Sequence, residues 1–235
     1  MVSIKVIGFD ADDTLWVNGT YFHEAENSFC VLLSEFMPKK ELIEELFRTE
    51  MKNMKWYGYG AMAYTLSLVE TAIRISDGKV SAAVIDKILG IGRDLLSRPV
   101  ELFPGVKEVL PVLHKYFRLI VVTKGDLLDQ ERKLKKSGLL PYFHQIEVVS
   151  EKHESNYLRL MDILNIKPEE FLMVGNSIRS DIQPVLSIGG KAVHIPKSEV
   201  WALENAEKPD APYYEISSMA ELPGILQIRL PDSLI

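Results

Sequence analysis

The chain has 235 residues, of which 47% are hydrophobic and 26% charged, and its formal net charge at pH 7 is -6. This composition predicts a globular protein rather than a disordered or fibrous one, and the absence of a basic stripe argues against a nucleic-acid partner. No segment approaches the roughly 18 consecutive apolar residues of a membrane span, and no apolar signal core begins the chain. We therefore expect a cytoplasmic monomer or homodimer with no membrane partner.

The first predicted element is a buried strand over Val2–Phe9, and acidic residues follow it directly. Asp10 and Asp12 then lie at the carboxyl end of a strand, where open parallel α/β sheets bind their ligands. Two carboxylates this close repel each other, so a divalent cation is the simplest source of compensating charge. The alternative is an ordinary turn after a strand, because Asp and Thr are common turn and N-cap residues.

Residues 17–98 contain helix-like segments and no convincing strand. Their apolar residues recur at helical spacing, which predicts an inserted all-helical subdomain. Asn18 lies just after the acidic motif, at the hinge into this subdomain, where a substrate would first be met. The four predicted helices are Phe22–Phe36, Lys39–Lys52, Ala61–Ile75 and Ser81–Leu96.

Strands and helices alternate from residue 105 onward, which is typical of βαβ units. We therefore predict an α/β core over 1–16 and 99–235, built as a doubly wound, Rossmann-like parallel sheet. Its further strands are Arg118–Thr123, Gln145–Val149, Phe171–Gly175 and Lys191–Ile195. Its helices are Val106–Tyr116, Leu127–Ser137, Ser155–Leu164, Ile178–Ile188 and Glu199–Ala206.

Polar residues also follow three of the later strands. Thr123 and Lys124 end one strand in a turn that can hold phosphate oxygens, and Lys152, after the next, offers a point charge. Asn176 and Asp181 follow the fourth strand with the oxygen ligands that hard cations prefer. Each residue alone has an ordinary interpretation as an N-cap, a surface lysine or a helix N-terminal acid. Their order at four successive strand ends is the stronger signal.

These motifs together resemble those of the haloacid dehalogenase-like superfamily of hydrolases. Asp10 to Thr14 is similar to its first motif, Thr123 to its second, Lys152 to its third, and Gly175 to Asp181 to its fourth. The helical segment resembles the type 1 cap of the family. The resemblance implies that Asp10 is a nucleophile and Asp12 a general acid/base, while Thr123 and Lys152 hold the phosphoryl group. It also implies that Mg²⁺ is bound by Asp10, the main-chain carbonyl of Asp12, and Asp181.

The implied function is Mg²⁺-dependent hydrolysis of a small phosphorylated metabolite through an aspartyl-phosphate. Asn176 departs from the family, which usually has aspartate there, and weaker metal binding is expected because an amide oxygen carries no charge. Lys124 and Arg179 are further candidates for substrate contact. A phosphomutase, a haloacid dehalogenase and a non-catalytic binding protein remain alternatives. Asp12 disfavours the dehalogenase, because carbon–halogen cleavage needs no protonated leaving group.

Overall fold

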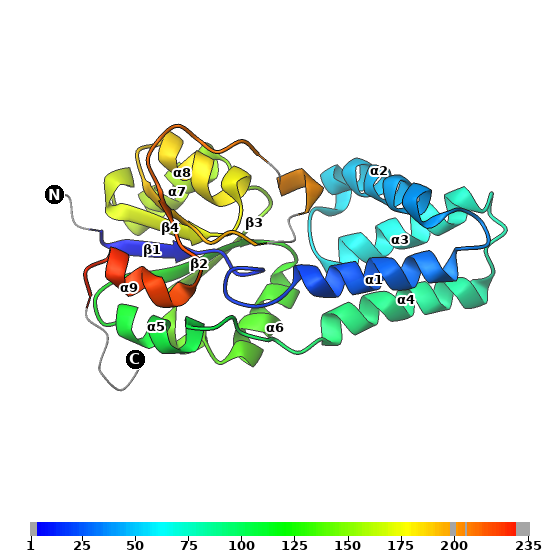
Figure 1. Cartoon of the computed structure of the whole chain (residues 1–235), viewed down its shortest axis with the longest axis horizontal. Coiled ribbons are helices and arrows are strands. Elements are labelled where there is room, and N and C mark those ends of the chain that lie inside the picture. The colour runs from blue at the N-terminus through cyan, green and yellow to red at the C-terminus, as the bar shows by residue number, and fades with distance from the viewer. Residues whose placement is uncertain (1–3, 198–200, 205, 229–235) are drawn as a thin grey trace. The chain divides into compact units, whose positions relative to one another are not determined.

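A computed structural model describes residues 4–197, 201–204 and 206–228. Within them, six parallel strands form one sheet in the order β3-β2-β1-β4-β5-β6 (Figure 1). β1 lies in the middle with β2 and β4 on either side, and its residue Phe9 is paired with Val121 and Val174. The carboxyl ends of these three strands therefore meet at one edge. The predicted doubly wound α/β fold is confirmed.

The strands are β1 (Val6–Phe9), β2 (Arg118–Lys124), β3 (Gln145–Val149), β4 (Phe171–Gly175), β5 (Lys191–His194) and β6 (Tyr214–Glu215). The helices that follow residue 100 are α5 (Val106–Leu113), α6 (Leu127–Ser137), α7 (Glu154–Leu164), α8 (Gln183–Ser187) and α9 (Leu222–Ile225). Short turns lie at η1 (Leu140–Tyr142), η2 (Pro168–Glu170), η3 (Ile178–Ile182), η4 (Ala202–Glu204) and η5 (Met219–Glu221). In the described part of the chain, no helix is both long and apolar enough to cross a membrane.

Alternate residues of the central strands face opposite sides of the sheet, as the period of a strand requires. Ile7 and Phe9 belong to a cluster that includes α5 and α9, whereas Val6 belongs to a cluster with α7 and α8. Figure 1 shows these two helix pairs over opposite faces. Both faces of the strands are therefore buried, which explains why their sequences read as continuous apolar runs.

A second compact unit comprises Thr20–Pro99 together with Gly125–Gln130, and the first comprises Met1–Gly19, Val100–Lys124 and Glu131–Ile235. Apart from Gly19, the second unit contains α1 (Gly19–Leu32), and it also contains α2 (Lys39–Tyr57), α3 (Ala61–Ile75) and α4 (Ala82–Ser97). Its own core includes Phe29, Leu42, Leu68 and Ile88, all fully buried. Cys30 is buried in the same cluster.

Several predicted helices differ from the structure at their ends, and two differ along their length. The segment predicted as one helix over Ile178–Ile188 is a π-helical turn followed by the short α8. Pro184 has no N–H to donate to the carbonyl of Ser180, so a regular α-helix cannot continue through this point. Of the predicted helix Glu199–Ala206, the described residues hold only the turn η4, and residues 199, 200 and 205 lie outside the described residues. Residues 2 and 3 of the predicted first strand also lie outside them.

Candidate active site

Asp10 is the first residue after β1, and it is buried where the central strands end. Its backbone N–H donates to the carbonyl of Val174 in β4 at 2.9 Å. The ammonium of Lys152, which follows β3, donates to Asp10 Oδ1 at 2.5 Å and to Asp181 Oδ1 at 2.7 Å. One buried lysine therefore joins two carboxylates, which meet because parallel strands end at a common edge of the sheet.

 Asp10 and Asp181 are thus far apart in the sequence and adjacent in the structure.

Asp10 and Asp181 share the single ammonium of Lys152, and this arrangement shifts the pKa values of Asp10 and Lys152. Burial raises the pKa of Asp10 to about 7, and Lys152 only partly offsets this effect because Asp181 lies beside the same ammonium. Burial alone would lower the pKa of Lys152, but the carboxylates of Asp10 and Asp181 raise it above its ordinary value. Lys152 is therefore charged at neutral pH, and its single ammonium faces two carboxyl groups.

Asp181 is held by the turn that follows β4. The backbone N–H of Ser177 donates to Asp181 Oδ2 at 3.0 Å, and the Ser177 hydroxyl accepts from the N–H of Ser180 at 3.0 Å. A Cβ atom at Gly175 would lie 2.2 Å from Asp181 Oδ2, so the carboxylate occupies space that only glycine leaves open. The carbonyl of Ser180 receives no helical hydrogen bond from residue 184, because Pro184 has no N–H. The hydroxyl of Tyr157 in α7 donates to this carbonyl instead, at 3.0 Å.

The Thr14 hydroxyl lies between the side chains of Asn176 and Asp10. The Thr14 hydroxyl oxygen lies 3.0 Å from Asp10 Oδ2 and 3.3 Å from Asn176 Oδ1, and its one hydrogen can be donated to either. The main-chain carbonyl of Asn176 lies 3.0 Å from Nε2 of the buried His194, whose other ring nitrogen is 3.2 Å from Glu215. His194 therefore supports the backbone that carries Asn176, and this contact was not predicted from the sequence.

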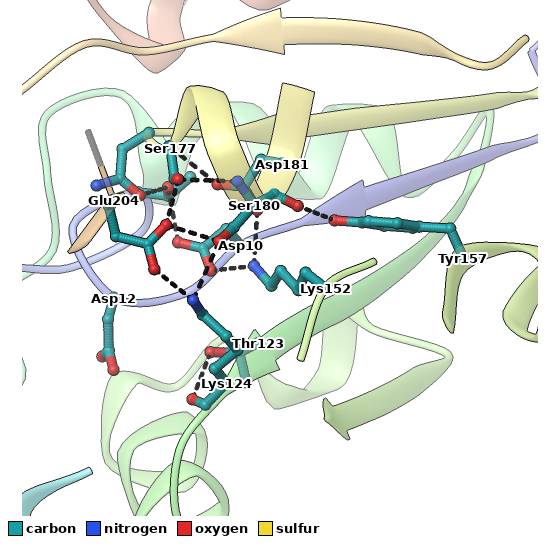
Figure 2. Close-up of polar contacts among 12 residues, drawn as sticks. Asp10, Asp12, Thr123, Lys124, Lys152, Tyr157, Ser177, Ser180, Asp181 and Glu204 are labelled. Carbon is teal, nitrogen blue, oxygen red and sulfur yellow. Dashed lines mark hydrogen bonds and ion pairs between the residues drawn. The ribbon is translucent and has the colours of Figure 1, made fainter. Parts of the chain in front are cut away.

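The Asp12 carboxylate turns toward other partners. Its Oδ1 accepts from Trp16 Nε1 at 2.7 Å and from the ammonium of Lys133 in α6 at 3.0 Å. The same ammonium donates to Asn18 Oδ1 at 2.9 Å. Figure 2 shows the Asp12 side chain apart from the cluster around Lys152. The structure thus groups Asp12 with Asn18, and Asp10 with Lys152 and Asp181.

The remaining predicted residues lie near the ends of β2 and β4. The Thr123 hydroxyl is buried and donates to the carbonyl of Lys124 at 3.2 Å. The Lys124 ammonium donates to the Ser180 hydroxyl at 3.0 Å and also binds Glu204. Arg179 is directed to the main-chain carbonyl of Leu203, which it contacts at 2.8 Å. Lys124 therefore joins the two strand ends, whereas Arg179 contacts the segment that carries Glu204.

Glu204 is a site residue that the sequence analysis missed. Its carboxylate accepts from the Ser180 hydroxyl at 2.6 Å and from the Ser177 hydroxyl, in addition to Lys124 (Figure 2). Burial alone would raise the pKa of Glu204, but Lys124 and the two hydroxyl groups lower it below its ordinary value. No motif or periodicity marks this position. Trp16 and Lys133 were also not predicted as partners of Asp12. In the sequence, Trp16 is typical of a core residue and Lys133 of a surface residue.

The donor set at this edge suits a hard cation such as Mg²⁺. Asp10 and Asp181 share one ammonium, and Asn176 Oδ1 shares a hydroxyl with Asp10, so three side-chain oxygens face a common region. Among the residues described, no group of three or more His, Cys, Asp or Glu side chains is placed to hold a metal ion. A magnesium site here must therefore combine two carboxylates with uncharged oxygens, which is within the ordinary ligand chemistry of this ion.

Comparisons with known proteins identify the family of this chain. Residues 4–189 match the family model described as haloacid dehalogenase-like hydrolase. A crystal structure of a haloacid dehalogenase-like family hydrolase from Xanthomonas campestris is 37% identical, with a TM-score of 0.87 over 96% of this chain and 91% of that one. The N-acylneuraminate-9-phosphatase of Mus musculus is 33% identical over 131 residues, but the match spans only about half of each chain (52% and 50%). The glyceraldehyde 3-phosphate phosphatase of Methanopyrus kandleri is 26% identical over 95% of this chain and 97% of that one.

Proposed function

This chain belongs to the haloacid dehalogenase-like hydrolase family, and within that family we propose that it is a Mg²⁺-dependent phosphatase of small phosphate monoesters. The observation that carries the proposal is the buried Asp10 carboxylate, which shares the Lys152 ammonium with Asp181. The curated relatives named above are phosphatases of an acylneuraminate and of a triose, and both names describe small phosphorylated substrates.

The charge at this edge supports a requirement for a cation. The acidic side chains outnumber the lysines that contact them: Asp10, Asp12, Asp181 and Glu204 against Lys124, Lys133 and Lys152. A phosphate dianion would meet an excess of negative charge at such a site unless a divalent cation bound with it. Mg²⁺ held by Asp10, Asp181, Asn176 and the carbonyl of Asp12 would supply that charge and lower the pKa of the carboxylates that bind it.

The proposed reaction has two steps. Asp10 attacks phosphorus, the bond to the leaving oxygen breaks, and a protonated Asp12 gives that oxygen its proton. Asp12 then takes a proton from water, which attacks the aspartyl-phosphate, releases phosphate and restores Asp10.

The other polar residues would hold the phosphoryl group and the rest of the substrate. We assign the phosphoryl oxygens to Lys152 and the Thr123 hydroxyl, because both lie at the strand ends beside Asp10. Lys124, Asn18 and Arg179 already have protein partners, and we assign them to the rest of the substrate. Asp12 favours phosphate chemistry over dehalogenation, because only an oxygen leaving group needs an acid.

The test is a screen of phosphorylated sugars, sugar acids and trioses with Mg²⁺, in which free phosphate is measured. We expect release from at least one class and its loss when Mg²⁺ is chelated. Asp10→Asn should lower kcat by ~10³-fold or more, because the nucleophile is removed. The exposed Asp162→Asn serves as the matched control and should retain parental turnover. Isomerisation of a substrate without phosphate release would identify a phosphomutase, and absence of any turnover or Mg²⁺ binding would refute the proposal.

A further inference from the structure

Glu204 reaches the candidate site from a distant part of the chain. It ends the turn η4, which follows β5, and it is not part of any strand end. Its side chain is only 14% exposed, and that of its partner Lys124 is 13% exposed. Arg179 gives the segment a second attachment, because its guanidinium donates to the main-chain carbonyl of Leu203 at 2.8 Å.

The three donors that Glu204 accepts from belong to two different strand ends. Lys124 is the last residue of β2, whereas Ser177 and Ser180 lie in the turn after β4. β2 and β4 flank β1 in the sheet, so one carboxylate links the strand ends on either side of Asp10. Figure 2 shows the Glu204 carboxylate between Lys124 and Ser177.

Each of these donors is adjacent to a residue of the proposed mechanism. Ser177 donates its N–H to Asp181 Oδ2, and Ser180 directly precedes Asp181 in the chain. Lys124 directly follows Thr123. Hydrogen bonds in which the donor or the acceptor is charged are about twice as strong as neutral ones, so the Glu204 carboxylate is a strong restraint on this geometry.

We propose that Glu204 is a positioning residue for the phosphatase site: its carboxylate fixes Lys124 and the Ser177–Asp181 turn, and thereby holds Asp181 in place to bind Mg²⁺. The inference rests on the proposed function, since it assigns Asp181 to the metal. Glu204 itself is bound by three protein donors and is not assigned to metal or substrate.

The primary experiment is calorimetric titration of the substrate-free protein with Mg²⁺, alongside kinetics at saturating Mg²⁺. Glu204→Gln keeps the side-chain shape but removes its charge. We expect its Mg²⁺ dissociation constant to rise at least about fivefold and its kcat to fall about tenfold, while Glu204→Asp recovers part of both losses. Glu207→Gln removes an exposed charge from the same segment and should leave both quantities unchanged.

A double-mutant cycle with Lys124→Gln tests the mechanism of this effect. If Glu204 acts by holding Lys124, the two losses in kcat should be clearly less than multiplicative. Should Glu204→Gln fail to fold, Ser180→Ala removes one hydrogen bond to the same carboxylate and should weaken Mg²⁺ binding in the same direction.

The outcomes separate the two proposals. The role of Glu204 is refuted, and the proposed function is not, if the parental protein binds Mg²⁺ and releases phosphate while folded Glu204→Gln stays within twofold of it. The comparison is made for both the Mg²⁺ dissociation constant and kcat. Multiplicative losses in the cycle would refute its action through Lys124. A lower thermal midpoint with parental Mg²⁺ binding would indicate a merely structural role. Parental protein with neither Mg²⁺ binding nor turnover would refute both proposals.

Discussion

Gly175 shows how a single residue shapes the candidate site, because the space of its absent side chain is taken by Asp181. A Cβ atom at this position would lie 2.2 Å from Asp181 Oδ2 and 2.3 Å from the carboxyl carbon. Such distances are far below van der Waals contact, so the carboxylate must move if a methyl group is added.

We therefore predict that Gly175→Ala displaces Asp181 and lowers kcat/KM at least about tenfold, which corresponds to ~1.4 kcal/mol of transition-state stabilisation. Steady-state kinetics and Mg²⁺ titration should both record the loss. Gly90→Ala is the matched control, because a Cβ atom there would meet only an Arg93 side-chain nitrogen, at an ordinary contact distance of 3.9 Å. Parental kinetics in Gly175→Ala would contradict the placement of Asp181.

At the residue scale, the sequence predicted side chains whose position follows from the end of a strand. Asp10, Lys152 and Asp181 were expected together for this reason, and the structure joins them through one ammonium. Glu204 could not be predicted, because it arrives from a turn whose place depends on tertiary packing. The orientation of the Asp12 side chain toward Trp16 could not be predicted either, because spacing along the chain does not specify a side-chain rotamer.

Helices α2 and α3 are tied by an ion pair between Glu45 and Arg74. Glu45 accepts from Arg74, which also donates to the Thr49 hydroxyl at 2.9 Å. The hydrogen bond from Arg74 lowers the pKa of Glu45 below its ordinary value. Because the pKa is lower in the folded state, the stabilisation is fully present above the unfolded pKa and is lost as the pH falls through the folded one.

We predict that Glu45→Gln lowers the free energy of unfolding by about 0.5–1 kcal/mol at pH 7, a modest value because Arg74 is largely exposed and water screens the pair. The difference from the parent should shrink as the pH falls below about 4.5. Urea unfolding across this pH range measures it. Glu44→Gln, at the exposed neighbouring position, should change stability much less, and a difference that grows in acid would show the sign to be wrong.

At the scale of elements, regular apolar periodicity predicted the helices well, but it did not predict local departures from regular helix. Ala61–Ile75 forms a helix with the predicted bounds, because its apolar residues keep one period throughout, and Leu127–Ser137 also has its predicted bounds. The turn at Ile178–Ile182 breaks that rule, since Pro184 and the contacts of Asp181 override helix propensity. The two-residue strand β6 has no sequence pattern of its own and depends on pairing with β5.

At the scale of the whole molecule, the chain leaves and re-enters the first unit through adjacent segments. The N–H of Val17 donates to the carbonyl of Glu101 at 2.9 Å, and the N–H of Phe103 donates to the carbonyl of Leu15 at 3.0 Å. Trp16 and Leu102 form an antiparallel bridge between them. The two ends of the insertion are therefore paired within the first unit, so closing them with a short linker costs little chain entropy.

We predict that replacing residues 20–99 with a short Gly/Ser linker leaves a folded α/β unit. Its sheet clusters lie within the first unit, so it should unfold cooperatively and bind Mg²⁺ within about threefold of the parent if Asp10 and Asp181 hold the ion. Some stability should be lost, because Gly125–Gln130 packs with the deleted helices. Circular dichroism, urea unfolding and Mg²⁺ titration measure these properties. A non-cooperative, unfolded product would show that the α/β unit depends on the insertion, whereas a folded product without Mg²⁺ affinity would place part of the metal site in the deleted residues.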